Sequence, residues 1–214
     1  MYVKRKMTAN PYTIAVDAPI NEALELMREK NIKRIPVIKG DKVVGMLTHM
    51  DIQNLSSPKA TTLSIFELNY LLSKAKVKDA MTKEVITISP DALLEEAAIL
   101  MRENRISSLT VMQDNKLVGI ITESDIFDAF IDLMGFRVVG TRITVEAADV
   151  PGALAAICET FRFFDANITH TVVYRGNAGK SDVVIRTNVL NTDAIEGKLE
   201  EQGYKIVHVL KNEE

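Results

Sequence analysis

The spacing of apolar residues predicts a strand, a helix, two strands and a second helix within the first 60 residues. The segments 12–16, 35–38 and 42–47 have the short apolar or alternating pattern that is typical of strands. Between the first two of them, residues 20–31 place one apolar stripe at helical spacing. A further helix is expected to begin at Thr48.

The same order of elements returns 74 positions later, with strands at 85–89, 109–112 and 116–121 and helices at 93–104 and 123–133. Aligned without a gap, residues 3–55 and 77–129 are identical at about 22 of 53 positions. Neither copy has enough elements to cover both faces of its own small sheet. We therefore expect the two copies to pack together as one pseudo-twofold domain.

The remaining segments complete the predicted domain order. Between the repeats, a loop at 56–59 precedes the capping-box pattern Ser64-Ile65-Phe66-Glu67, which predicts a helix to about Lys74. After Gly135 the pattern changes to strand 137–145, a helix ending near Phe164, strands 167–174 and 181–188, helix 193–202 and strand 204–210. This βαββαβ order is the ferredoxin-like pattern. The prediction is an α/β (α+β) chain with repeat 1 at 1–60, a linker helix at 61–76, repeat 2 at 77–134 and a third domain at 137–214.

Composition narrows the class of protein further. With 47% hydrophobic residues, the 214-residue chain can form real cores. A net charge of −3 argues against a broad nucleic-acid-binding face. The sequence contains no window of 18 uninterrupted apolar residues, so no membrane-spanning helix is predicted. Cys158 is the single cysteine, which excludes an intrachain disulfide and a cysteine-based metal site. We expect a cytoplasmic protein that binds neither nucleic acid nor membrane.

One motif, Gly-x-x-Thr-x-x-Asp, ends the last strand of each repeat and begins the following helix. Thr48 and Thr122 would lie near a helix N-terminus, where free N–H groups and the helix dipole attract phosphate. Asp51 and Asp125 would lie in the first turn, where a carboxylate can accept two hydrogen bonds from the vicinal diol of a ribose. The glycine of each motif would leave the backbone open to a flat ligand.

The same spacing also has a purely structural interpretation. Thr-x-x-Asp is close to a capping box, and each such cap stabilises a helix by about 1 kcal/mol without any ligand. Spacing alone therefore leaves both a ligand site and a pair of helix caps open.

Together with Lys4-x-x-Met7-Thr8 and the strand Ile35-Pro36-Val37, the two motifs resemble a tandem pair of CBS domains, the family named after cystathionine β-synthase. The resemblance covers about residues 1–134. It implies a cleft for an adenosine-containing ligand, commonly AMP, ADP or ATP, with the motif Asp on the ribose hydroxyls and the motif Thr near the phosphate or ribose. The implied pocket walls are Thr13, Ile35, Pro36, Thr87 and Leu109.

The two repeats differ at positions that matter for an anionic ligand. Arg34 and His49 place basic groups in the first repeat, where the second has Ser108 and Glu123. Because phosphate is attracted to the basic set, we expect the site with Asp51 to bind the nucleotide more tightly. His49 could equally be a solvated residue at a helix start.

The stretch Asp149-Val150-Pro151-Gly152-Ala153-Leu154, together with Asn167-Ile168, resembles the ACT domain, a small amino-acid-sensing fold. From the residues alone, Asp149 is a candidate helix cap and Pro151 suits the first helical turn. The resemblance covers about residues 137–210. It implies sheets that pair between chains and a possible interface site for a free amino acid, formed by Asp149, Pro151, Gly152, Ala153, Asn167 and Ile168. Many members of that family only dimerise.

No catalytic machinery is visible. The sequence has no nucleotide-binding glycine loop or metalloprotease motif, and His170 and His208 read as ordinary strand residues rather than metal ligands. The domain order resembles the acetoin-utilisation B-type proteins of bacteria. We expect a homodimeric, non-enzymatic regulatory protein without a metal, which senses an adenine nucleotide. The alternative is a structural adaptor in which both sites are degenerate.

Overall fold

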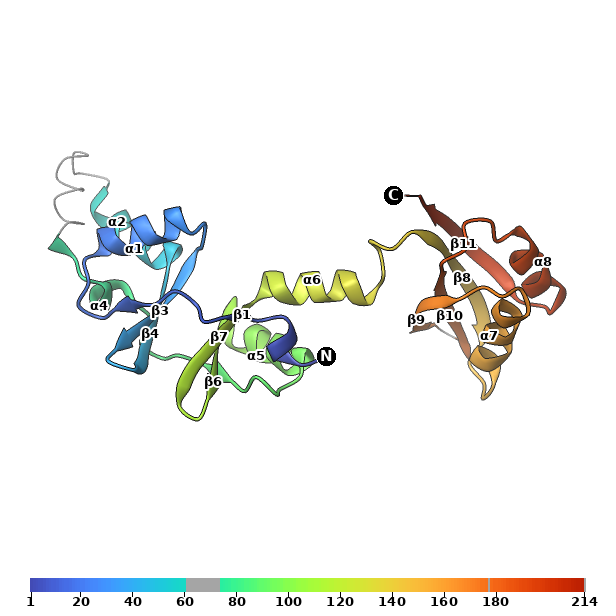
Figure 1. The fold of residues 1–214 in the computed structure, drawn as a ribbon, viewed down its shortest axis with the longest axis horizontal. Coiled ribbons are helices and arrows are strands. Elements are labelled where there is room, and N and C mark those ends of the chain that lie inside the picture. Colours follow the sequence, from blue (N-terminus) through green and yellow to red (C-terminus); the bar gives the residue numbers. More distant parts are fainter. Residues whose placement is uncertain (61–73, 177, 214) are drawn as a thin grey trace. The chain divides into compact units, whose positions relative to one another are not determined.

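The computed structural model describes residues 1–60, 74–176 and 178–213 and divides into two compact units, Met1–Ile126 and Phe127–Glu214 (Figure 1). The predicted linker helix at 61–76, with its capping-box pattern at Ser64, lies almost wholly outside the described residues. No helix in the described part of the chain is long and apolar enough to cross a membrane.

The first unit contains both repeats. The elements of repeat 1 are η1 (Val3–Arg5), β1 (Thr8–Ala9), β2 (Ile14–Ala15), α1 (Ile20–Glu29), β3 (Arg34–Lys39), β4 (Lys42–Thr48) and α2 (His49–Ala60). Those of repeat 2 are α4 (Val77–Ala80), β5 (Thr87–Ile88), α5 (Leu94–Asn104), β6 (Ser108–Gln113), β7 (Lys116–Thr122) and α6 (Glu123–Leu133), which runs on into the second unit. The predicted strands and helices all occur, while η1, β1 and α4 were not predicted.

The two repeats have the same register and the same pattern of burial. Arg34 is paired with Thr48 between antiparallel β3 and β4, and Ser108 is paired with Thr122 between β6 and β7. The burial pattern of β3 is identical to that of β6, and that of β4 to that of β7. Strand β2 runs parallel to β3, as β5 does to β6. The duplication seen in the sequence is therefore a duplication of structure.

The N-terminal segment of each repeat is hydrogen-bonded to the other repeat. The main-chain N–H of Val3 donates to Ala92 O at 2.9 Å, and the equivalent Val77 donates to Ala18 O at 2.9 Å. Further along, β1 is antiparallel to β7 of the second repeat, and residue 82 forms the matching bridge to β4 of the first. Salt bridges repeat the exchange, because Lys4 lies 2.7 Å from Asp91 and Lys78 lies 2.8 Å from Asp17. The repeats are thus interlocked through their N-terminal segments.

The space beside each motif glycine is filled by protein. A Cβ on Gly45 would lie 2.5 Å from Met81 Sδ and 3.0 Å from Thr82 O. A Cβ on Gly119 would lie 2.5 Å from Met7 Sδ. The prediction that these glycines leave the backbone open to a flat ligand is therefore wrong. They are needed because the starting segment of the opposite repeat passes directly over the strand.

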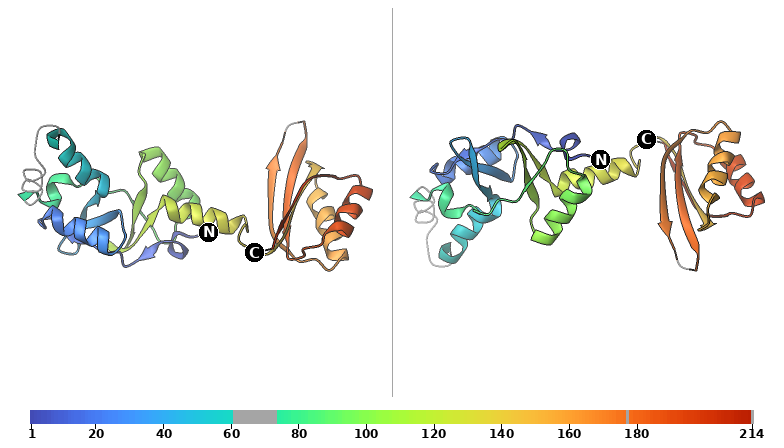
Figure 2. Two further views of the ribbon diagram at one scale, coloured as in Figure 1. Left: turned by 90° about the horizontal axis from the view of Figure 1, so that it is seen from above. Right: turned by 90° about the horizontal axis from the view of Figure 1, so that it is seen from below.

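The second unit is a four-stranded antiparallel sheet covered on one face by two helices (Figure 2). Its elements are β8 (Gly140–Ala148), α7 (Ala153–Phe163), β9 (Ile168–Arg175), β10 (Lys180–Thr187), α8 (Asp193–Glu201) and β11 (Lys205–Asn212), with sheet order β11-β8-β10-β9. Ile143 and Ile185 of the sheet pack in one core with Phe161 of α7 and Leu199 of α8. The predicted βαββαβ order is confirmed.

Candidate functional site

Two hollows in the first unit contain a motif threonine. The Asp51 pocket has a volume of about 470 Å³ and is lined by residues 84–86, 101, 102 and 105–108 with Met46, Thr48, Asp51, Thr82 and Glu123. The Thr122 pocket has a volume of about 690 Å³ and is lined by residues 8–12 and 30–34 with Ile120, Thr122 and Ser124. Both volumes lie in the range of small-molecule sites.

The two pockets are equivalent under the 74-residue offset, and each is built from both repeats. Thr82, Ile86 and Ser108 of the Asp51 pocket correspond to Thr8, Tyr12 and Arg34 of the Thr122 pocket. In each pocket, the motif turn of one repeat faces the N-terminal segment of the other repeat and the residues that lead into its strand β3 or β6. The pairing follows from the interlocked N-terminal segments described above.

The motif residues form helix caps in both repeats. Thr48 donates to Asp51 Oδ2 through its main-chain N–H at 2.8 Å and through its hydroxyl at 2.7 Å. The main-chain N–H of Asp51 donates back to Thr48 Oγ1 at 3.2 Å. Thr122 and Asp125 repeat all three contacts, at 2.7, 2.7 and 3.3 Å. This is the reciprocal arrangement of a capping box, so the structural interpretation of the motif is confirmed.

Capping does not exclude a ligand, because it uses one carboxylate oxygen. All the contacts above involve Oδ2, and within the described residues Oδ1 of Asp51 and of Asp125 makes no hydrogen bond. A carboxylate can accept about four hydrogen bonds, so each keeps capacity for sugar hydroxyls. Both side chains are partly exposed. Asp51 lines its pocket directly, whereas Asp125 bonds to Thr122 without itself lining the Thr122 pocket.

The two pockets differ in charge. The Thr122 pocket is lined by Lys30, Lys33 and Arg34 and by no acidic residue. The Asp51 pocket has two cations, Arg102 and Arg105, against three carboxylates, those of Asp51, Glu84 and Glu123. An anionic group is therefore favoured by the Thr122 pocket.

Arg34 connects the two pockets. Its side chain lines the Thr122 pocket, and its Nη1 donates to the main-chain oxygen of Ser107, which lines the Asp51 pocket. Burial lowers the pKa of Arg34, and the carboxylates of Glu123 and Asp125 oppose that shift. The expected grouping of Arg34 with Asp51 is wrong, because the pockets combine opposite repeats. The Asp51 pocket is therefore not the more basic of the two, contrary to the expectation from the sequence.

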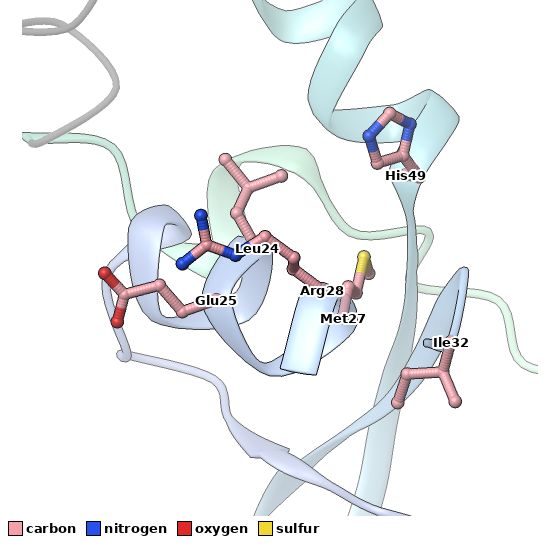
Figure 3. Close-up of a pocket in the computed structure, with 6 residues that line it drawn as sticks. All are labelled: Leu24, Glu25, Met27, Arg28, Ile32 and His49. Carbon is pink, nitrogen blue, oxygen red and sulfur yellow. The ribbon is translucent and has the colours of Figure 1, made fainter. Parts of the chain in front are cut away.

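His49 lies in a third hollow, which shares Ile32 with the Thr122 pocket and no residue with the Asp51 pocket. Figure 3 shows it at the start of α2, where it shares a space of about 410 Å³ with Leu24, Met27 and Ile32. The ring is exposed. The prediction that His49 joins Asp51 in one pocket is not supported, since His49 lines the third hollow and Asp51 lines the Asp51 pocket.

The other predicted wall residues also lie apart from the pocket linings. Ile35, Pro36 and Leu109 are buried, while Thr13 and Thr87 are at least partly exposed but do not line either pocket. Thr110, at the position equivalent to Pro36, is buried and its hydroxyl donates to Ile86 O at 3.4 Å. Residues that precede these strands form the walls instead, such as Tyr12 before β2 and Ile86 before β5.

Sequence reasoning missed the residues that come from the N-terminal segments and from the end of α1 and α5. Tyr12 and Lys33 on one side, and Ile86 and Arg105 on the other, line the pockets. The 74-residue offset relates Tyr12 to Ile86 and could have paired them, but it could not have shown that these segments cross to the opposite repeat.

In the second unit, the six residues predicted for an amino-acid site fall at two ends of the sheet. Asp149 follows β8 beside Gly179, and its carboxylate lies 3.8 Å from Arg175. Asn167 lies at the other end, where its N–H donates to Asn188 Oδ1 at 3.1 Å. Strand β8 between these ends has nine residues, so about 27 Å separates them. One chain does not bring the six residues together.

The start of α7 also differs from the prediction. Gly152, with φ +90°, is the N-cap residue, no side chain caps the helix, and the helix begins at Ala153. Asp149 is therefore not the cap, and Pro151 precedes the first helical turn. Ile168 begins β9 and is partly buried. A Cβ on Gly152 would meet nothing within 4 Å, so this helix end is open.

The comparison with known proteins agrees with the repeat. The family model for the CBS domain matches residues 3–57 and 77–132. Inosine-5'-monophosphate dehydrogenase of Methanocaldococcus jannaschii is 35% identical over 116 residues, which are 53% of this chain and 20% of the enzyme. The chain spans 20–28% of the length of three such dehydrogenases that it matches.

Solved structures are similar over the same region. An acetoin utilization protein (AcuB) from Vibrio cholerae has 28% identity and a TM-score of 0.52 over 64% of this chain and 95% of that chain. The CBS domain pair of protein MJ0100, in complex with 5'-methylthioadenosine and S-adenosyl-L-methionine, has 28% identity and a TM-score of 0.52 over 61% and 95%. CBSX2 in complex with AMP has 29% identity and a TM-score of 0.52 over 61% and 97%. The chain belongs to the CBS domain family and carries the domain as a tandem pair.

Proposed function

We propose that this protein is a non-enzymatic regulator whose CBS pair binds adenosine-containing ligands, with the motif carboxylates on the ribose. The observation that carries the proposal is the pair of equivalent pockets, each lined by a motif threonine whose capping Asp keeps one carboxylate oxygen unused. Structurally similar CBS pairs were solved with AMP and with 5'-methylthioadenosine and S-adenosyl-L-methionine.

The charges of the pockets suggest a division of ligands. We assign ligands with a phosphate chain, AMP, ADP or ATP, to the Thr122 pocket, because Lys30, Lys33 and Arg34 line it without an acid. The Asp51 pocket, in which three carboxylates face two guanidinium groups, suits a neutral or cationic adenosine derivative. This reverses the expectation drawn from the sequence, in which the site with Asp51 was to bind the nucleotide more tightly.

The second unit is proposed to be an ACT domain, at 137–214, that pairs two chains and transmits the state of the CBS pair. Its βαββαβ order and the open, uncapped helix end at Gly152 support this assignment. Because Asp149 and Asn167 lie at opposite ends of one sheet, an amino-acid site that uses both would need a second chain. A homodimer is therefore part of the proposal.

A structural adaptor is the second candidate, and the completed capping boxes favour it, because Thr48 and Asp51 stabilise α2 without a ligand. Isothermal titration of the full chain with ATP and with 5'-methylthioadenosine distinguishes the two. Saturable binding of either ligand supports the regulator, and flat titrations with both would leave the adaptor.

Variants locate the binding. We expect Asp51→Asn to weaken 5'-methylthioadenosine and Lys33→Met to weaken ATP, each by about tenfold, which corresponds to about 1.4 kcal/mol. Asn at position 51 keeps a side-chain oxygen for the cap. Lys116→Met removes an exposed lysine outside both pockets and serves as the matched control. Equal losses of ATP affinity in the Lys33 and Lys116 variants would contradict the assignment.

A further inference from the structure

The face of the second unit's sheet that carries no helix holds a row of basic residues. Core residues Ile143 and Ile185 point toward α7 and α8, so their strand neighbours Arg142 and Arg186 point to the opposite face. Arg186 of β10 is paired with Arg142 of β8 on one side and with His170 of β9 on the other. Like charges directly opposite each other on one face of a sheet are destabilising, so this arrangement calls for an explanation.

Arg186 is buried without an acidic partner. Its residue is only 5% exposed, and within the described residues its side chain makes no salt bridge or hydrogen bond. The neighbouring contact is with the ring of Phe136, whose centroid lies 5.5 Å from Cζ. Burial lowers the pKa of Arg186, and the positive charge of Arg142 lowers it further. An arginine cannot escape by losing its proton, so a buried charge without a counter-ion remains.

The acidic residues of the same face are distant. Asp182 and Glu146 are paired with each other four positions along the strands from the arginine row, which is about 13 Å. Glu146 lies 2.6 Å from Lys180 and is thereby neutralised. Arg142 is partly exposed, and its Nη1 donates to Thr144 Oγ1 at 2.8 Å. Neither carboxylate of the strand pair therefore lies within reach of the row.

The segment that follows α6 lies against this row. Besides the contact of Phe136, a Cβ on Gly135 would lie 2.3 Å from Nδ1 of His170, so that residue 135 must be glycine at φ +64°. Asn212 Nδ2 donates to the main-chain oxygens of Phe136 and Val138 at 3.1 and 3.0 Å and holds the segment in place. The basic residues of the row therefore lie on the sheet and are contacted from one side by Gly135 and Phe136 of the connecting segment.

We propose that Arg142 and Arg186, with His170 beside them, bind a small oxyanion, a carboxylate or a phosphate, on the open face of the second unit's sheet. Two guanidinium groups in one cross-strand pair can each give parallel N–H donors to such a group, which is the recognition geometry that arginine favours. The anion supplies the missing counter-charge and removes the repulsion between the arginines. Phe136, just after α6, would then touch the occupied site.

The test is calorimetric titration of the full-length protein with malonate and with inorganic phosphate, against sodium chloride at matched ionic strength. The two probes distinguish a carboxylate from a phosphate source. We expect saturable binding of at least one probe. Arg142→Gln and Arg186→Gln should weaken that binding at least tenfold, while Lys180→Gln, in the same sheet but at its acidic end, should leave it unchanged.

The change in stability of the Arg142→Gln variant is a second measurement, and the proposal predicts its direction. Without an anion, Arg142→Gln should unfold at the same or a higher urea concentration than the wild type, because repulsion is removed. A purely structural arginine pair would give lower stability and no anion response. The proposal is overturned by titrations no different from chloride, by unchanged anion affinity in Arg142→Gln, or by a response that tracks dimer formation in sedimentation, which would assign the row to a second copy.

Discussion

The guanidinium of Arg34 in the first repeat donates a hydrogen bond to the main-chain oxygen of Ser107 in the second. Arg34 lines the Thr122 pocket and Ser107 lines the Asp51 pocket, so one bond joins the walls of both sites. A ligand that draws Arg34 toward a phosphate would act on this bond. The contact thus offers a physical link between the two pockets.

Arg34→Met should lower stability and alter both pockets. Hydrogen bonds to charged groups contribute about 1.5–3 kcal/mol, and the variant loses one across the repeat interface. Urea unfolding should show a loss in this range, and ATP affinity should fall as well. Lys33→Met is the matched control, since Lys33 is exposed in the same pocket. It should weaken ATP while leaving the free energy of unfolding within about 0.5 kcal/mol of the wild type.

Thr48→Val should destabilise the first unit by about 0.5–2 kcal/mol, the usual range for a lost N-cap. Valine keeps the shape of threonine and the main-chain bond to Asp51, but it loses the two hydrogen bonds of the hydroxyl group. Urea unfolding of Thr122→Val should show a similar loss, because the second cap has the same three contacts. Unchanged stability in both variants would mean that neither cap contributes to folding.

Gly45→Ala should destabilise by about 1–3 kcal/mol, as expected for an added methyl group in a packed interior. The new Cβ would approach Met81 Sδ to 2.5 Å and Thr82 O to 3.0 Å, and the main-chain oxygen cannot move aside as easily as the methionine. If the glycine instead kept space for a ligand, the alanine variant would fold normally and lose only ligand affinity. Thermal unfolding and titration of the same sample separate these outcomes.

Gly197→Ala should increase the free energy of unfolding, in contrast to Gly45→Ala. Gly197 is exposed inside α8, and a Cβ there would meet nothing within 4 Å. Alanine in place of glycine in a helix interior stabilises by about 0.5–1 kcal/mol. The gain should be confined to the unfolding of the second unit. A loss of stability would indicate that this exposed helix position contacts another chain.

Cys158 should report on the second unit through its rate of alkylation. Burial raises the pKa of this thiol, with a partial offset from a backbone hydrogen bond. Because only the thiolate reacts, the folded protein should react with iodoacetamide more slowly than a free cysteine at pH 7.5, and its rate profile should lie at higher pH. Addition of urea should restore the ordinary rate. A folded-state rate equal to that of free cysteine would contradict the raised pKa.

The sequence by itself determined the duplication and the element order. Both repeats have the same spacing of apolar residues and therefore the same strands and helices. This follows because the period at which apolar residues recur determines whether a segment buries one face as a helix or as a strand. The βαββαβ order after Gly135 followed in the same way. The Thr–Asp caps were also predictable, since a capping box joins residues only three positions apart.

Only the tertiary structure decided which residues share a pocket. The N-terminal segments cross between repeats, so Arg34 faces Thr122 rather than Asp51, and Met81 fills the space beside Gly45. The cross-strand pairing of Arg142 with Arg186, 44 positions apart, likewise follows from sheet register. The local pattern of apolar residues determines which face of a helix or strand is buried. The segment that packs on that face is far away in the sequence, and the local pattern does not specify which segment it is.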